Sequence, residues 1–179
     1  MTGSDSLHRH MPGLLVLLAL ALLAGCADRE SAQRSVAPQE ITAGTYCELD
    51  GMSLTDYPGP KAQIHYADQE QPAFFCDTVE LFNTLLTGEQ VRPVRAVYVQ
   101  DMAKADWTEP RGHWIEARKA IYVLGSRRQG SMGPTIASFS EQADAERFVS
   151  EFGGRVVRFS EITPDMVDLR GGAAHDTTM

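Results

Sequence analysis

The stretch Ala73-Phe-Phe-Cys-Asp-Thr-Val-Glu-Leu-Phe-Asn-Thr-Leu-Leu-Thr-Gly88 decides the fold, because it contains a complete transition from strand to helix. Its first three residues are apolar and aromatic, which predicts a short strand. Asp77 and Glu80 have the spacing of a capping box, so a helix should begin at Asp77. The helix keeps its apolar residues on one face until Gly88 ends the pattern; they are Val79, Phe82, Leu85 and Leu86.

The neighbouring segments predict further strands, in an order that occurs twice along the chain. Residues 62–66 alternate like a half-buried strand, and residues 95–100 are β-branched and aromatic. Downstream, residues 114–115, 120–124 and 135–139 are strand-like, and residues 155–159 supply the last strand. Ser140 is predicted to open a second helix, whose apolar residues before Gly153-Gly154 are Ala143, Phe148, Val149 and Phe152.

We therefore predict an α+β fold of two ββαβ-like units, at about residues 43–104 and 105–168, that form one compact domain. The self-similarity between the units is weak at the level of residues. An α+β domain with halves that resemble each other by chance is the alternative. Residues 169–179 have the composition of a disordered tail.

The N-terminus predicts a lipoprotein signal peptide over residues 1–25. An apolar run at residues 14–23 follows Arg9, is shorter than the roughly 20 residues of a membrane-spanning helix, and ends in Leu23-Ala-Gly-Cys26. Cleavage before Cys26 would leave a lipidated cysteine, with a thioether-linked lipid and palmitate, and a flexible polar tether over residues 26–42. An ordinary secretory peptide and an uncleaved anchor are the alternatives.

These features predict a periplasmic protein that its lipid holds at a membrane. Ala27, rather than aspartate, follows the cysteine, which favours the outer membrane over the inner one. The formal net charge is −8, and an acidic surface argues against nucleic acid and anionic lipid as partners. Two cysteines remain, Cys47 and Cys76, and in an exported protein they form a disulfide by default.

The body lacks the common enzyme motifs, namely a helical His-Glu-x-x-His, a phosphate-binding Gly loop, Cys-x-x-Cys and Gly-x-Ser-x-Gly. Sulfur donors instead fall at expected loops or strand ends: Cys47, Met52, Met102 and Met132. Thiolate and thioether sulfur select Cu(I) over hard cations. Each methionine has a structural alternative as a gap-filling or surface residue.

The remaining polar candidates are interpreted one by one. His113, beside Trp114, is a candidate ligand, whereas His65 on a strand is interpreted as a solvated or hydrogen-bonded histidine. Cys76 is interpreted as buried and inert. Cys47 is either a free thiolate ligand five positions before Met52 or the partner of Cys76 in a disulfide, which would contribute roughly 3 to 4 kcal/mol of stability.

The sequence resembles the NosL family of nitrous oxide reductase accessory lipoproteins, which are periplasmic copper chaperones. The resemblance covers about residues 46–162. It rests on Cys47-Glu-Leu-Asp-Gly-Met52, Tyr57-Pro-Gly-Pro-Lys-Ala-Gln-Ile64, Val97-Tyr-Val-Gln-Asp-Met102, Trp114-Ile115 with Ala120-Ile-Tyr-Val123, and Gly130-Ser-Met-Gly-Pro134. It implies an α+β fold and a Cu(I) site that supplies the copper centres of the reductase.

The resemblance also implies ligands and partners. Met102 matches the family's methionine at a strand end, so Met102, Cys47 and Met52 are the first candidate ligands, with His113 and Met132 after them. Many members have the cysteine two residues before the methionine, whereas four residues separate them here. Members often have another residue at the position of Cys76. A copper exporter or assembly proteins and nitrous oxide reductase are the implied partners.

Three other functions remain open. The first is a copper chaperone for a different client enzyme, because a scaffold does not identify its client. The second is a thiol enzyme with Cys47 as nucleophile and His113 as base. The third is a structural or assembly lipoprotein with a Cys47–Cys76 disulfide. For the chaperone we predict no catalytic turnover, because only bonds to the metal are made and broken.

Overall fold

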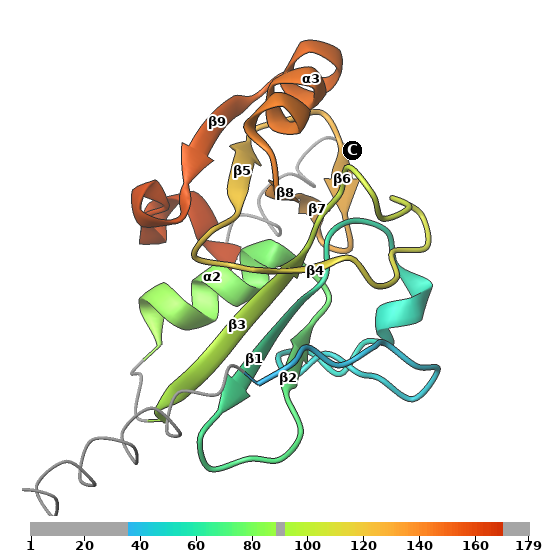
Figure 1. The fold of residues 1–179 in the computed structure, drawn as a ribbon, viewed down its shortest axis with the longest axis vertical. Helices are drawn as coiled ribbons and strands as arrows, with labels where there is room; N and C mark the ends of the chain where they lie inside the picture. The colour runs from blue at the N-terminus through green and yellow to red at the C-terminus, as the bar shows by residue number, and fades with distance from the viewer. Residues whose placement is uncertain (1–35, 89–91, 170–179) are drawn as a thin grey trace, which may run out of the picture. The chain divides into compact units, whose positions relative to one another are not determined.

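The computed structural model describes residues 36–88 and 92–169 (Figure 1). The predicted signal peptide, Cys26 and nearly all of the predicted tail lie outside these residues. Among the described residues, no helix has both the length and the apolar character needed to cross a membrane. The elements are η3 (Leu54–Asp56), β1 (Ala62–Tyr66), β2 (Ala73–Phe75), α2 (Thr78–Thr87), β3 (Val94–Gln100), β4 (Trp114–Glu116), β5 (Ile121–Leu124), β6 (Gln129–Gly130), β7 (Gly133–Pro134), β8 (Ala137–Phe139), α3 (Gln142–Phe152), β9 (Arg155–Arg158), η4 (Phe159–Glu161) and η5 (Pro164–Val167).

The first sheet contains four antiparallel strands in the order β2-β1-β3-β4. All five residues of its central strand β1 are buried. Helix α2 follows β2 and begins with the predicted capping box, in which Asp77 accepts from the Val79 amide at 2.9 Å and Glu80 from the Asp77 amide at 3.2 Å. The elements β1, β2, α2 and β3 therefore form the first predicted ββαβ unit.

The second sheet repeats this topology with the order β8-β5-β9, again antiparallel, and with α3 between β8 and β9. The prediction of two ββαβ units is confirmed. Two details differ from the expectation. Strand β4 pairs with β3 in the first sheet, and the second helix has Glu141 as its N-cap rather than Ser140. The Ser140 hydroxyl instead donates to Asp101 at 2.5 Å, so it joins α3 to the end of β3.

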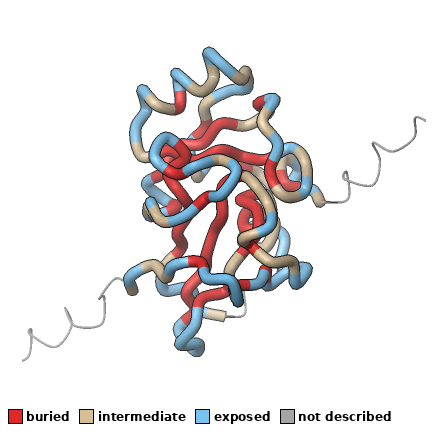
Figure 2. The backbone as a smooth tube through the Cα atoms, turned by 90° about the vertical axis from the view of Figure 1, so that its right-hand side faces the viewer, coloured by how far each residue is buried: buried red, intermediate tan, exposed pale blue. Residues whose placement is uncertain are grey.

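One hydrophobic core is shared by both units. The ring of Phe82 on α2 meets the ring of Tyr122 on β5 edge to face, with centroids 5.0 Å apart. The same cluster contains Ile64 of β1, Val97 of β3 and Val157 of β9. Figure 2 shows the buried residues concentrated along the strands. Because the units share this core, they form one compact domain.

Residues 36–42, which their polar composition assigns to the flexible tether, are docked on this domain. The Gln39 amide donates to Gln63 Oε1 at 2.8 Å, and Gln63 Nε2 donates back to the Gln39 carbonyl at 2.9 Å. The Tyr98 hydroxyl donates to the Val36 carbonyl, and Ile41 is buried. The compact body therefore begins at residue 36. Residues 36–42 contact the domain mainly through backbone N–H and C=O groups. Nearly every residue type has these groups, so amino-acid composition could not predict this docking.

Candidate metal-binding site

Three buried side chains converge at one end of the first sheet. Cys47, Cys76 and Glu80 each offer a ligand atom, and these atoms lie within 4.8 Å of one another. Cys47 Sγ and Glu80 Oε2 are hydrogen-bonded at 3.2 Å. Both cysteines are free thiols in this structure, and their exposed fractions are 4% and 0%. Among the described residues, this is the one group of at least three Cys, His, Asp or Glu side chains close enough to share a metal ion.

Cys47 is presented by a tight hairpin before η3. The Cys47 amide donates to the Met52 carbonyl at 2.8 Å, and the Gly51 amide donates to the Cys47 carbonyl at 3.0 Å. Gly51 has a φ of 75°, which a residue without Cβ adopts most easily. The hairpin brings Met52 beside Cys47 although four residues separate them. Met52 is half-buried and packs against the cluster that contains both cysteines.

Cys76 and Glu80 come from the strand-to-helix transition. Cys76 directly follows β2, and Glu80 lies in the first turn of α2. The capping-box hydrogen bond turns the Glu80 carboxyl back toward the start of the helix, where it also meets Cys47. The backbone hydrogen bond from the Glu48 amide to the Phe74 carbonyl, at 2.8 Å, holds the hairpin against β2. The capping box therefore positions a polar partner for the Cys47 sulfur.

The sulfur of Cys47 lies in an environment that favours its thiolate. A hydrogen bond from the Cys76 thiol lowers the pKa of Cys47 to about 6, and the amides of Cys76, Asp50 and Leu49 add to this against the effect of burial. The same hydrogen bond and burial raise the pKa of Cys76. Burial raises the pKa of Glu80 to about 9. The hydrogen bond between the two thiols therefore makes Cys47 the more readily ionised one.

This donor set fits a soft metal ion. Two cysteine sulfurs and the adjacent Met52 thioether are soft donors, which prefer Cu(I), Zn(II) or iron–sulfur clusters to Mg²⁺ or Ca²⁺. Glu80 is a hard donor, and its hydrogen bond to Cys47 makes it a natural outer-shell partner of the sulfur. The half-buried rings of Phe74 and Trp114 pack against the same cluster and limit its contact with water.

The structure brings only part of the predicted ligand set together. Cys47 and Met52 are adjacent, as described above. Met102, the first-ranked methionine, packs in a different hydrophobic cluster with Ile121 and Phe139. Met132 is 54% exposed in the turn between β6 and β7. His113 is exposed, with a φ of 54°, directly before Trp114.

Cys76 was interpreted from sequence as buried and inert, and only its burial is confirmed. Its contact with Cys47 follows from the position of the 46–53 hairpin against β2, about thirty residues away in the sequence. A capping box that begins directly after Cys76 and has Glu80 in the first turn of the helix was the available signal for the polar partner. Neither the disulfide nor the thiol enzyme matches this geometry, because both thiols are free in this structure and the Cys47 sulfur is hydrogen-bonded to Glu80 and Cys76 rather than to His113.

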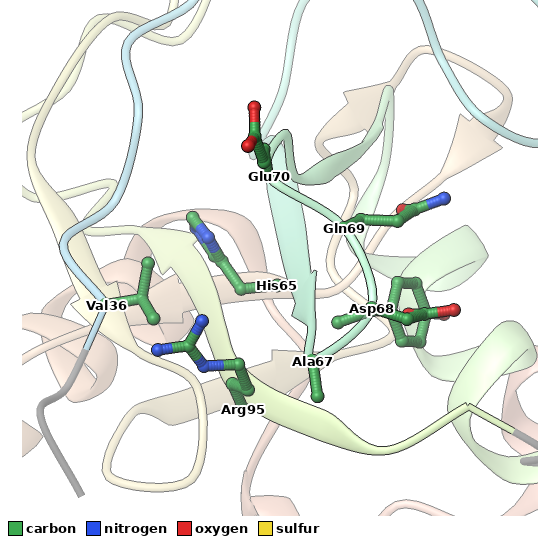
Figure 3. A pocket seen from close by; sticks show the side chains of 8 residues that line it. Val36, His65, Ala67, Asp68, Gln69, Glu70 and Arg95 are labelled. Carbon is green, nitrogen blue, oxygen red and sulfur yellow. The ribbon is translucent and has the colours of Figure 1, made fainter. Parts of the chain in front are cut away.

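A separate surface pocket of about 300 Å³ lies at the far end of β1, where Val36, His65, Glu70 and Arg95 are among the lining residues (Figure 3). His65 Nε2 is hydrogen-bonded to Gln63 Oε1 at 2.8 Å, which confirms the interpretation of His65 as a hydrogen-bonded histidine. Burial, with the nearby Arg95 charge, lowers the pKa of His65. The pocket lining contains no sulfur donor, so the pocket is distinct from the group formed by Cys47, Cys76 and Glu80, which we call the thiol cluster.

Comparison with known proteins gives the family. The model of the NosL family matches residues 38–167, which is most of the chain and includes every residue of the thiol cluster. The chain belongs to the NosL family. This NosL chain is similar to the copper-binding lipoprotein NosL of Stutzerimonas stutzeri, with 36% identity over 178 residues that cover 96% of this chain and 93% of the relative.

Two further NosL proteins agree. The copper-binding lipoprotein NosL of Achromobacter cycloclastes is 41% identical over 161 residues, which cover 86% of this chain and 81% of that protein. The crystal structure of the copper chaperone NosL from Shewanella denitrificans matches with a TM-score of 0.69 and 42% identity, over 74% of this chain and 98% of that one. The resemblance found in the sequence and the α+β fold are therefore both confirmed.

Proposed function

We propose that this NosL protein is a membrane-tethered periplasmic carrier of Cu(I), with the buried thiol cluster as its binding site. The observation that carries the proposal is the convergence of Cys47, Cys76 and Glu80 within 4.8 Å, next to Met52. Relatives at 36% and 41% identity are named copper-binding lipoproteins, which supports copper as the cargo.

In this proposal Cys47 is the principal ligand, because its hydrogen bond with Cys76 lowers the pKa of its thiol and so favours the metal-binding thiolate. Cys76 supplies the second sulfur, and Met52 completes the site from the solvent side. Glu80 remains an outer-shell partner. Met102, His113 and Met132 are left out of this donor set, because the first packs in another cluster and the other two are exposed.

The arrangement suits transfer rather than catalysis. Low coordination by sulfur ligands holds Cu(I) and still permits an acceptor to replace the ligands one at a time. Met52 lies on a short hairpin, so a small movement of one turn would open the site. We propose that the copper reaches nitrous oxide reductase, that a membrane copper exporter or an assembly protein supplies it, and that the protein performs no turnover.

The lipid anchor belongs to the same proposal. Cys26, ten residues before the compact body, would carry the lipid and hold the protein at the membrane, and Ala27 favours the outer membrane. The names of both relatives contain the word lipoprotein, which supports an anchored form.

The test is a titration of the reduced, purified chain with Cu(I) against a competing chelator. We expect one tightly bound ion per chain. Cys47→Ala should weaken binding by more than the roughly 10- to 100-fold that outer-shell changes cost. Met102→Ala is the matched control, because it removes a buried sulfur from the other cluster, and it should leave the affinity nearly unchanged.

Tryptophan fluorescence gives an independent assignment of the site in the same titration. Trp114 packs against the cluster of Cys47, and Trp107 packs against the cluster of Met102. A copper ion at Cys47 should therefore quench Trp114 in a Trp107→Phe variant. Quenching of Trp107 in a Trp114→Phe variant, together with a loss of affinity in Met102→Ala, would contradict the proposed site. Absence of Cu(I) binding would contradict the carrier function.

A further inference from the structure

Lys61 places a fully buried ammonium group directly behind the thiol cluster. Its exposed fraction is 0%. Nζ donates to the carbonyl of Cys76 at 2.9 Å and to the carbonyl of Pro58 at 2.9 Å. Lys61 directly precedes β1, at the end of the sheet where Cys76 follows β2. A buried lysine is costly unless negative charge compensates it, so its neighbours decide what it does there.

The ionisable groups that act on Lys61 belong to this site. Burial lowers the pKa of Lys61. The opposite effect, a rise in the pKa, comes from the negative charge of four neighbouring groups: Cys76, Asp77, Glu80 and Cys47. Asp77 is engaged elsewhere, with Thr135 Oγ1 at 2.6 Å and the amides of Val79 and Ser131. A metal ion bound by the cysteine sulfurs would therefore lie close to the ammonium.

We propose that Lys61 is a specificity-determining residue that makes the thiol cluster prefer a monovalent soft ion over a divalent one. This inference rests on the proposed function, because it takes the thiol cluster to be the Cu(I) site. Lys61 contacts no metal and acts through its charge and through the Cys76 carbonyl that it holds.

The physical reason is the positive charge of Lys61 in a buried site. The ammonium repels any cation bound beside it, and surroundings of low dielectric constant screen that repulsion only weakly. Whatever the charge on Asp77 and Glu80, repulsion from Lys61 is twice as large for a divalent ion as for a monovalent one at the same position. Zn(II), which also prefers thiolate ligands, is the natural competitor.

A ratio of affinities separates this effect from the other consequences of removing Lys61. Loss of the ammonium also makes the thiols harder to deprotonate, which weakens every metal that displaces the same protons. That effect, like a general loosening of the site, enters the Cu(I) and Zn(II) affinities alike and cancels in their ratio. The change in repulsion does not cancel.

The experiment compares the dissociation constants of Cu(I) and Zn(II), measured by chelator competition at one pH and ionic strength on the reduced chain. Lys61→Met removes the charge and retains most of the side-chain volume. Lys61→Gln also removes the charge but keeps N–H groups for the buried carbonyls, so it provides the measurement if the methionine variant fails to fold. Lys119→Met is the charge-matched control, because Lys119 is exposed and pairs with Glu116.

In both Lys61 variants we expect the ratio of the Zn(II) to the Cu(I) dissociation constant to fall by about tenfold or more. Loss of a unit charge close to the metal in a protein interior implies an effect of this size. Lys119→Met should keep the native ratio. A native ratio in a folded Lys61 variant, or an equal shift in Lys119→Met, would overturn this inference while Cu(I) binding itself stands. If the native chain binds no Cu(I), the proposed function fails instead.

Discussion

At the scale of single residues, one carboxyl oxygen links the folding of a helix to the chemistry of a thiol. Glu80 Oε2 accepts from the Asp77 amide at 3.2 Å and is also 3.2 Å from Cys47 Sγ. A hydrogen bond with Cys76, one position before the helix cap, lowers the pKa of the same sulfur. Groups at the start of α2 thus act on the ionisation of Cys47, the proposed principal ligand.

The ionisation of Cys47 gives a prediction with a definite direction. Because the Cys76 hydrogen bond is the largest cause of its pKa of about 6, Cys76→Ala should raise that pKa. In the reduced, metal-free protein, the thiolate absorbance in the ultraviolet should rise through about pH 6. The rise should move toward alkaline pH in Cys76→Ala. The unfolded chain in urea provides the reference, and a native midpoint equal to that reference would contradict the thiolate assignment.

At the scale of elements, Asp77 joins three segments that are distant in sequence. Its carboxylate caps α2 through the Val79 amide, accepts from the Thr135 hydroxyl before β8, and accepts from the Ser131 amide in the β6–β7 turn. The start of α2 therefore lies at the junction of both units, and the positions of Cys76 and Glu80 depend on it.

We expect Asp77→Ala to lower the free energy of unfolding by about 2 to 4 kcal/mol, because it removes a helix cap and leaves buried donors without an acceptor. Asp77→Asn should cost less, since its amide oxygen can still cap the helix. Urea unfolding monitored by circular dichroism measures both. Glu141→Ala is the matched control, because Glu141 is the N-cap of α3 but makes no side-chain capping bond. Equal losses in Asp77→Ala and Glu141→Ala would contradict the junction role.

At the scale of the whole molecule, the two units are joined at the ends of their strands. The Met102 amide donates to the Ser138 carbonyl at 2.8 Å, and the Ser138 hydroxyl donates to the Gln100 carbonyl at 2.6 Å. With the compact body beginning at residue 36, Cys26 lies ten positions earlier in the sequence. Even a fully extended chain of that length would keep the body within about 35 Å of the proposed lipid on Cys26.

The short connection predicts a role for the anchor in copper delivery. Confinement near a membrane raises the effective concentration of the carrier toward a donor in the same membrane. A Cys26→Ser variant, exported to the same abundance, should therefore load nitrous oxide reductase with severalfold less copper when copper is limiting. Copper per reductase, measured by elemental analysis of the purified enzyme, gives the result. Equal loading would contradict a role for the tether, and in vitro Cu(I) binding should be unchanged.

The sequence by itself determined the local elements and their order. The capping box at Asp77 and Glu80, the apolar spacing of both helices and the alternating strands depend on neighbours within a few residues, which is why they were predicted closely. Motifs around Cys47 and Met52 identified the family for the same reason, since they are contiguous. The chemical character of the cargo followed from the sulfur donors.

Only the tertiary structure decided which of those donors meet. Packing of the hairpin against β2 brought Cys47 to Cys76 and Glu80, while Met102 was drawn into the core around Ile121. It also assigned β4 to the first sheet and docked residues 36–42 through backbone hydrogen bonds. Contacts of this kind depend on the register and closure of distant segments, whereas capping and periodicity act between neighbours; the local pattern therefore predicts the elements, and long-range packing selects the site.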